Sequence, residues 1–175
     1  MSISQSLRQK VRQRANFLCE YCQVSETDSG GELTVDHYQP QSGNGSDEEI
    51  NLVYCCFRCN SYKGDYWHIP TNQTRVFNPR TDSRDEHFWL SESGKLFALS
   101  EIGETTIELL RLNRKPLVTK RARDFQKLEE RQILEQTQKA VEMLIHLTQQ
   151  QHELLEKQQF ILKEQKRLIE ILTKN

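Results

Sequence analysis

Two pairs of cysteines with the spacing C-x-x-C are the feature that most constrains this chain. The first pair is Cys19 and Cys22, and the second is Cys56 and Cys59. Two cysteines separated by two residues form a tight turn that points both sulfur atoms at one ion, and four thiolates in two such pairs are typical of a structural zinc site. Only 35% of the 175 residues are hydrophobic, so we expect zinc to stabilise a core that apolar burial alone stabilises poorly.

The segment between and after these pairs has the pattern of a strand, a long loop, a second strand and a helix. Leu33–Asp36 alternates apolar and polar residues, as a half-buried strand does. Proline and glycines within 40–46 mark a loop, and Asn51–Tyr54 returns as a strand. The chain from Cys59 to about Asp65 is predicted to form a short helix.

Three polar residues in this segment suit the hydrolysis of a phosphodiester. That reaction needs a base for the attacking water and a cation for the charge on the departing oxygen. His37 is the candidate base, because an unperturbed imidazole is largely neutral near pH 7 and can accept a proton. Asp36 and Asn60 offer oxygen ligands for Mg²⁺ or Mn²⁺ and leave room for water and phosphate oxygens.

Residues 8–65 resemble the HNH nuclease family in the order of these features, namely the pair Asp36-His37, then Asn51 and Asn60, all combined with the two C-x-x-C pairs. The resemblance implies a ββα-metal core that cuts nucleic acid with one divalent ion and leaves 5′-phosphate and 3′-hydroxyl ends. It implies that the side-chain amide of Asn51 braces the loop around the catalytic His37. Asn60 stands where many members have histidine, which keeps the ligand role and gives the pattern H-N-N.

Basic residues near this core are candidates for contact with phosphates. Lys63 is assigned to the catalytic group because its charge can neutralise the scissile phosphate, and Arg58 is a second candidate. A helix is predicted over residues 5–16, where phosphates would attract the basic side chains. The alternative for this helix is an ordinary solvated surface. The nucleic-acid-binding candidates are Arg8, Arg12, Arg14 and Arg58.

Residues 68–115 are expected to form an accessory segment that packs on the core. Residues 88–90 and 96–99 flank a Ser/Gly turn and are predicted to form a hairpin, and 104–112 is predicted to be helical. His87 is either a second metal or phosphate ligand or a packed histidine, and the second assignment is favoured. Cys55 is expected to be a buried apolar residue, although an exchange of ligand role with Cys56 stays open.

Residues 116–175 are predicted to form one long helix. Beyond residue 120 there is no glycine or proline, and apolar pairs such as Leu154/Leu155 and Ile161/Leu162 recur every seven residues. This recurrence favours a coiled coil with a second copy of the chain, and the alternative is a partly frayed charged tail. No segment is apolar enough for a membrane span or a secretory signal, so we expect a cytoplasmic protein.

The sequence therefore predicts an α+β fold. Residues 1–67 are expected to form a zinc-stabilised ββα-metal core, 68–115 an accessory segment and 116–175 an oligomerisation helix. The predicted function is metal-dependent hydrolysis of DNA, with RNA a less favoured substrate that stays open, since attack on phosphorus does not require a particular sugar. The net charge of −1 gives no global basic field, so binding of nucleic acid must come from local basic patches. The alternatives are a zinc-knuckle module that binds nucleic acid without cutting it, and a coiled-coil adaptor with an inactive head.

Overall fold

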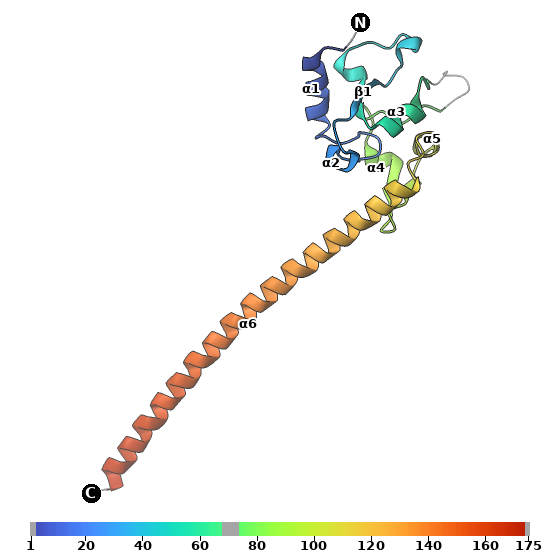
Figure 1. The fold of residues 1–175 in the computed structure, drawn as a ribbon. Helices are drawn as coiled ribbons and strands as arrows, with labels where there is room; N and C mark the ends of the chain where they lie inside the picture. Colours follow the sequence, from blue (N-terminus) through green and yellow to red (C-terminus); the bar gives the residue numbers. More distant parts are fainter. Residues whose placement is uncertain (1–2, 68–73, 174–175) are drawn as a thin grey trace. The chain divides into compact units, whose positions relative to one another are not determined.

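The computed structural model describes residues 3–67 and 74–173, so the start of the accessory segment expected at residue 68 lies outside the described residues. Contacts divide the chain into two units, Met1–Phe125 and Gln126–Asn175. The first is a mixture of helices and short strands, and the second is helical, which confirms the predicted α+β class with a small sheet core and a long C-terminal helix (Figure 1). The division into three domains stays a prediction.

A two-stranded antiparallel hairpin is the centre of the first unit. Strand β1 (Thr34–His37) pairs with β2 (Leu52–Cys55), so that Thr34 lies opposite Cys55 and His37 opposite Leu52. All four residues of β2 are buried. Both strands lie one residue further along the chain than the sequence pattern predicts.

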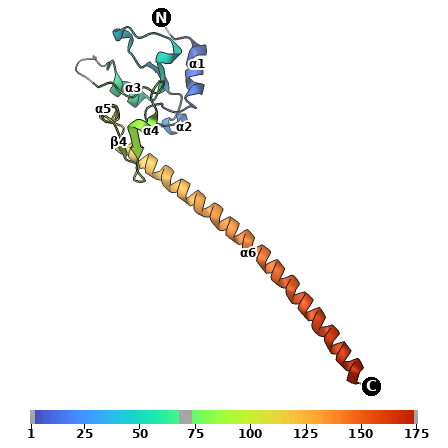
Figure 2. The ribbon, with the colours of Figure 1, turned by 180° about the vertical axis from the view of Figure 1, so that it is seen from behind.

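Two helices flank this hairpin, α1 (Gln5–Arg14) and α3 (Phe57–Lys63), as Figures 1 and 2 both show. Helix α1 begins where the Ser4 hydroxyl accepts a hydrogen bond from the Leu7 amide. Helix α3 begins at Cys56, whose Sγ accepts a hydrogen bond from the Cys59 amide, and ends at Gly64 with a φ of 47°. The helix expected from Cys59 thus starts two residues earlier.

Short elements connect the hairpin to the flanking helices. Helix α2 (Glu26–Ser29) begins with a capping box made by Ser25 and Asp28. The loop between β1 and β2 contains two 3-10 turns, η1 (Gln41–Gly43) and η2 (Glu49–Asn51). Because strand pairing fixes both ends of this loop, its turns lie beside the end of β1.

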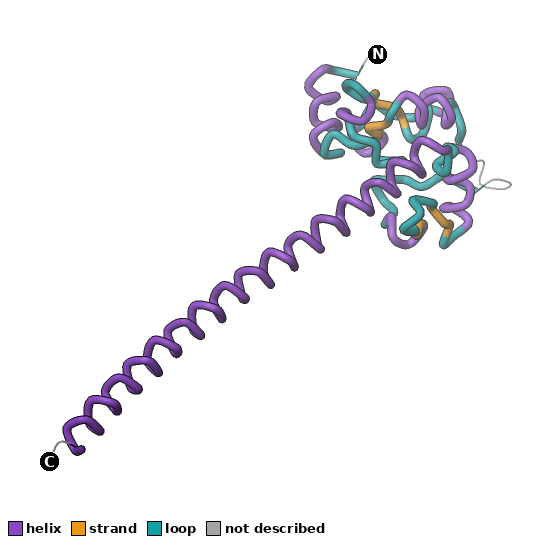
Figure 3. The backbone as a smooth tube through the Cα atoms, turned by 60° about the horizontal axis from the view of Figure 1, so that its bottom comes forward, coloured by secondary structure: helices purple, strands orange, loops and turns teal. Residues whose placement is uncertain are grey.

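A second hairpin follows the core, in the segment expected to be accessory. Helix α4 (Arg84–His87) leads into β3 (Phe88–Leu90), which pairs with β4 (Leu96–Ala98), and α5 (Glu101–Leu109) follows. Figure 3 shows the two pairs of strands as separate elements. The hairpin is where the sequence predicts it, and α5 lies three residues earlier than expected.

Helix α6 (Lys115–Thr173) begins in the first unit. The turn of the second hairpin packs against this first part so closely that a Cβ at Gly94, where φ is +81°, would lie 2.2 Å from the Val118 carbonyl oxygen. Leu117 and Arg121 are buried here. The helix continues through the second unit, and no helix in the described part of the chain has the length and apolar character to cross a bilayer.

Candidate metal centres and active site

All four cysteines of the two C-x-x-C pairs meet in one buried cluster. The Sγ atoms of Cys19, Cys22, Cys56 and Cys59 lie within 4.8 Å of one another. In each pair the amide of the second cysteine donates to the Sγ of the first, at 3.4 Å in both cases. Thiolates are the sulfur species that bind zinc and accept such bonds, so the cluster fits a tetrahedral zinc ion.

Three arginines supply a further test of whether zinc fits this cluster. Arg114 Nη2 lies 3.8 Å from the Sγ atoms of Cys56 and Cys59 and 3.9 Å from that of Cys22. Arg84 is held by the carbonyl of Tyr21, and Arg121 is buried at the start of α6. Burial lowers the pKa of Arg84, and it lowers that of Arg121 to about 10.

The guanidinium group of Arg114, which lies beside buried sulfur, is stabilised by negative charge there. Four neutral thiols would supply none, whereas four thiolates around one divalent zinc ion carry a net negative charge that the arginines balance. Burial lowers the pKa of Arg114, but negative charge on Cys59 and Cys22 outweighs this and raises the pKa above its ordinary value. The donor set and its surroundings therefore fit zinc.

The fifth cysteine and the candidate histidine of the accessory segment lie outside this cluster. Cys55 is buried on β2, where its Sγ lies 3.8 Å from the Thr34 hydroxyl and burial raises the pKa of its thiol. His87 Nδ1 lies 2.6 Å from the Ser100 hydroxyl, and its ring packs edge-on against Phe77. The zinc-like cluster thus contains Cys56 and not Cys55, and His87 has the contacts of a packed side chain.

The pair Asp36-His37 lies at the end of β1, and Lys63 of α3 holds both residues. Lys63 Nζ lies 3.1 Å from Asp36 Oδ2 and donates to the carbonyl oxygen of His37 at 2.6 Å. The lysine side chain is fully buried. Asp36 Oδ2 is buried and accepts no hydrogen bond within the described residues, so it meets Lys63 as an ion pair. The other carboxylate oxygen, Oδ1, is the one left for a cation.

Asn60 lies on the side of β1 where α3 packs. Its Nδ2 donates to the hydroxyl of Thr34 at 3.4 Å, and Thr34 and Asp36 share one face of the strand because side chains alternate. The amide nitrogen is therefore used for positioning, and Oδ1 of Asn60 is left as the atom that can bind a metal ion.

The imidazole of His37 meets a carboxylate from the loop. His37 Nε2 lies 2.7 Å from Asp47 Oδ1, and Gln41 Nε2 donates to the same oxygen at 3.0 Å. The hydrogen bond with His37 lowers the pKa of the Asp47 carboxyl from its ordinary value. The His37 side chain is 14% exposed, so the candidate base is partly sheltered from solvent.

Asn51 fastens this loop with three hydrogen bonds. Its Oδ1 accepts from the Gln39 amide at 2.8 Å, and its Nδ2 donates to the carbonyls of Gln39 at 3.0 Å and Ser46 at 2.9 Å. A Cβ at Gly45 would lie 1.8 Å from the Gln39 carbonyl oxygen, so only glycine fits there. The side-chain amide of Asn51 thus fixes Gln39 and Ser46, two residues of the loop that follows His37, and Ser46 is next to Asp47.

The predicted phosphate-binding arginines have different surroundings. Arg12 forms a bidentate ion pair with Glu26 at 2.6 and 2.8 Å, and Arg14 donates to the carbonyl of Leu52 at 2.7 Å. Arg8 and Arg58 are exposed. Arg12 and Arg14 therefore stabilise the fold, and their guanidinium groups already bind a carboxylate or a carbonyl of the chain.

Sequence reasoning missed two groups of residues at these sites. Asp47 stands in the acidic run 47–49, where nothing local distinguishes the carboxylate that meets His37. Arg84, Arg114 and Arg121 come from segments far along the chain from the cysteines. Only the three-dimensional arrangement brings them together, so no local signal in the sequence could have identified them.

Comparisons with known proteins place this site in a family. The HNH endonuclease family model matches residues 19–66, which include both cysteine pairs and the Asp36–Lys63 region. The Septu protein PtuA of Bacillus mycoides is 26% identical over 148 residues, covering 68% of this chain and 21% of that protein. The CRISPR-associated endonuclease Cas9 of Corynebacterium diphtheriae is 36% identical over 87 residues, covering 47% of this chain and 8% of that protein.

The chain thus spans about a fifth of the first relative and less than a tenth of the second. The similarity concerns a domain and not these whole proteins. The matched segment contains the β1–β2 hairpin, its loop, α3 and the four clustered cysteines. Residues 19–66 of this chain are an HNH endonuclease domain.

Proposed function

We propose that this chain is a metal-dependent endonuclease that hydrolyses DNA phosphodiester bonds at the end of β1. The observation that carries the proposal is that Lys63 binds the Asp36 carboxylate and the main chain of His37 at one strand end, within residues that match the HNH family.

In this proposal His37 takes a proton from the attacking water, and Asp36 and Asn60 hold one Mg²⁺ or Mn²⁺ ion through oxygen. Such an ion, when bound, stabilises the charge that develops on the phosphate and on the departing 3′ oxygen. Asn51 holds the loop beside the base. The expected products have 5′-phosphate and 3′-hydroxyl ends.

The basic residues take separate parts in this proposal. Lys63 keeps the backbone of His37 and the carboxylate of Asp36 in place, and its charge adds to the positive potential around the phosphate. The exposed Arg8 and Arg58 contact the phosphates of the DNA strand. Arg12 and Arg14 contribute less, because carboxylates and carbonyls of the chain already bind them.

DNA is the proposed substrate, and RNA is less favoured. The relative Cas9 bears the name of an endonuclease, and the HNH match supports nucleic acid as the class of substrate. With a net charge of −1, binding would depend on local basic groups, and we expect affinity to fall steeply with salt.

We expect Asp36→Asn to lower both metal affinity and cleavage. An amide oxygen carries no charge, so the divalent ion loses its only anionic ligand in the proposed set. Binding of Mn²⁺, followed by electron paramagnetic resonance, should weaken by about 10-fold or more, in line with typical effects at metal sites. Asp65→Asn, which removes an exposed carboxylate just beyond α3, is the matched control. Unchanged Mn²⁺ binding in Asp36→Asn would remove Asp36 from the metal site.

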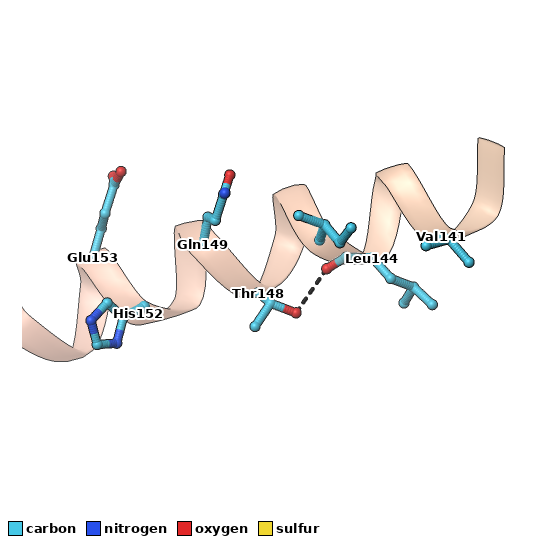
Figure 4. Close-up of a pocket in the computed structure, with 7 residues that line it drawn as sticks. Val141, Leu144, Thr148, Gln149, His152 and Glu153 are labelled. Atoms are coloured by element: carbon cyan, nitrogen blue, oxygen red, sulfur yellow. Dashed lines mark hydrogen bonds between the residues drawn. The ribbon is translucent and has the colours of Figure 1, made fainter. Parts of the chain in front are cut away.

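We further propose that residues 126–173 of α6 pair with a second copy of the chain as a coiled coil. Large apolar side chains of this unit are exposed, among them Leu155 at 55% and Leu162 at 56%. Figure 4 shows part of the unit, with Thr148 and His152 pointing to one side and Gln149 and Glu153 to another. A single helix cannot bury such a stripe, so a partner helix is required.

Two glutamates in the apolar stripe should separate the copies. We expect the double variant Leu155→Glu with Leu162→Glu to have the mass of a monomer in light scattering, while the unchanged chain has that of a dimer. The variant Gln149→Glu with Lys163→Glu places two glutamates away from the stripe and should stay dimeric. If the unchanged chain is a monomer at micromolar concentration, the coiled-coil proposal is wrong. A dimer carries two active sites, so its loss should reduce linearisation of plasmids more than nicking.

A further inference from the structure

The loop between β1 and β2 is built around one carboxylate, that of Asp47. Asn51 Nδ2 holds the carbonyl of Ser46, the residue before Asp47, and Gln41 donates to Asp47 Oδ1 itself. Gly45 permits the chain to pass directly over the Gln39 carbonyl. These contacts leave Asp47 Oδ1 at 2.7 Å from His37 Nε2, so the position of the carboxylate is set from several sides.

The chemistry of this contact decides where the imidazole proton lies. An ionised carboxylate can only accept hydrogen bonds, so His37 Nε2 must carry the hydrogen of this bond. In the neutral imidazole the other nitrogen, Nδ1, then holds the lone pair. Lys63 fixes the backbone of the same residue through its carbonyl oxygen. Both the ring and the main chain of His37 are therefore oriented.

We propose that Asp47 is the positioning residue of the nuclease site, which selects the His37 tautomer with Nδ1 as the proton acceptor. This inference rests on the proposed function of His37 as base. During hydrolysis Nδ1 takes one proton from the attacking water, and Nε2 keeps its own proton on the Asp47 carboxylate. The imidazolium formed in this step is then paired with a negative charge, which stabilises it.

The same geometry gives Asn51 a specific task. Its amide does not touch the imidazole in the described structure but holds the Ser46 carbonyl, one residue before Asp47. Asn51 therefore acts on His37 through Asp47. The effects of substitutions at Asn51 and Asp47 on the cleavage rate should consequently not be additive, because both substitutions disrupt the same series of contacts to His37.

The test uses the full chain with ¹⁵N-labelled histidine imidazoles. The His37→Gln variant assigns the His37 resonances among the five histidines. At a pH where the ring is neutral, we expect Nε2 protonated and Nδ1 unprotonated in the unchanged chain. We expect Asp47→Ala to give a mixture of the two tautomers, and Asp47→Glu to restore the original one in large part, because the longer carboxylate can still accept the bond.

Kinetics supply the second measurement. We expect Asp47→Ala to lower kcat for DNA cleavage by about 10- to 100-fold, as the loss of a group that orients a catalytic residue does, while KM changes little. Glu48→Ala removes the neighbouring exposed carboxylate and should change neither kcat nor the spectrum. A His37 ring protonated on Nδ1 in the unchanged chain, or a spectrum and kcat unaltered in Asp47→Ala, would overturn the proposal. If the unchanged chain cuts no DNA, the proposed function fails, and the spectra still decide whether Asp47 selects the tautomer.

Discussion

Replacing His37 with alanine should remove nearly all cleavage of supercoiled plasmid by this chain. In the proposed mechanism His37 supplies the base, and a positioned base contributes about 100- to 10,000-fold to the rate. The His37 side chain lies in a partly exposed place at a strand end, so its loss should leave the fold intact. The measurement is nicking and linearisation with Mg²⁺ or Mn²⁺, and near-ultraviolet circular dichroism verifies the fold of each variant.

The control for this substitution is His146→Ala, which removes an exposed imidazole from α6 and should leave the rate unchanged. Cleavage that survives in His37→Ala would mean that another group is the base or that a contaminating nuclease is present. No cleavage by either protein, with both metals and several DNA substrates, would favour a domain that binds nucleic acid without cutting it. Partial recovery of His37→Ala by added imidazole would tie the loss to the missing base itself.

The parts of the site that the sequence predicts are those with a local signal. The cysteine spacing, the alternation in β1 and the order of Asp36, Asn51 and Asn60 can each be recognised within a few residues. The order of strand, loop, strand and helix is found in the structure. The boundaries differ by one to three residues, because the pairing of Thr34 with Cys55 and the cap at Cys56 set the ends of the elements.

The parts that the sequence does not predict depend on contacts between distant segments. Lys63 illustrates this. The sequence predicts that its charge neutralises the scissile phosphate, whereas in the structure its side chain is buried against Asp36 and the His37 carbonyl. Asp47 and Arg114 are further examples, since each acquires its partner only when a loop or a later helix folds back. Apolar residues reveal their partners through the periodic pattern of a strand or helix. A single charged residue belongs to no such pattern, so the sequence alone cannot assign its partner.

Loss of one cluster cysteine should unfold the HNH core. We expect Cys59→Ser to lose its zinc and to lose the near-ultraviolet dichroism of the buried Tyr21 and Tyr54. Zinc binding stabilises small zinc-finger peptides by about 10–16 kcal/mol, which is as large as the whole stability of a typical domain. Far-ultraviolet dichroism would report this poorly, because α6 contributes helix in the second unit regardless of the metal.

The matched control for this prediction is Cys55→Ala, since Cys55 is equally buried and lies outside the cluster. It should retain one zinc ion per chain by elemental analysis and keep most of the tyrosine signal. A chelator should reproduce the effect of Cys59→Ser in the unchanged chain, and added zinc should reverse it. If Cys59→Ser retains both its metal and its tyrosine signal, the four sulfur atoms do not hold a structural zinc ion.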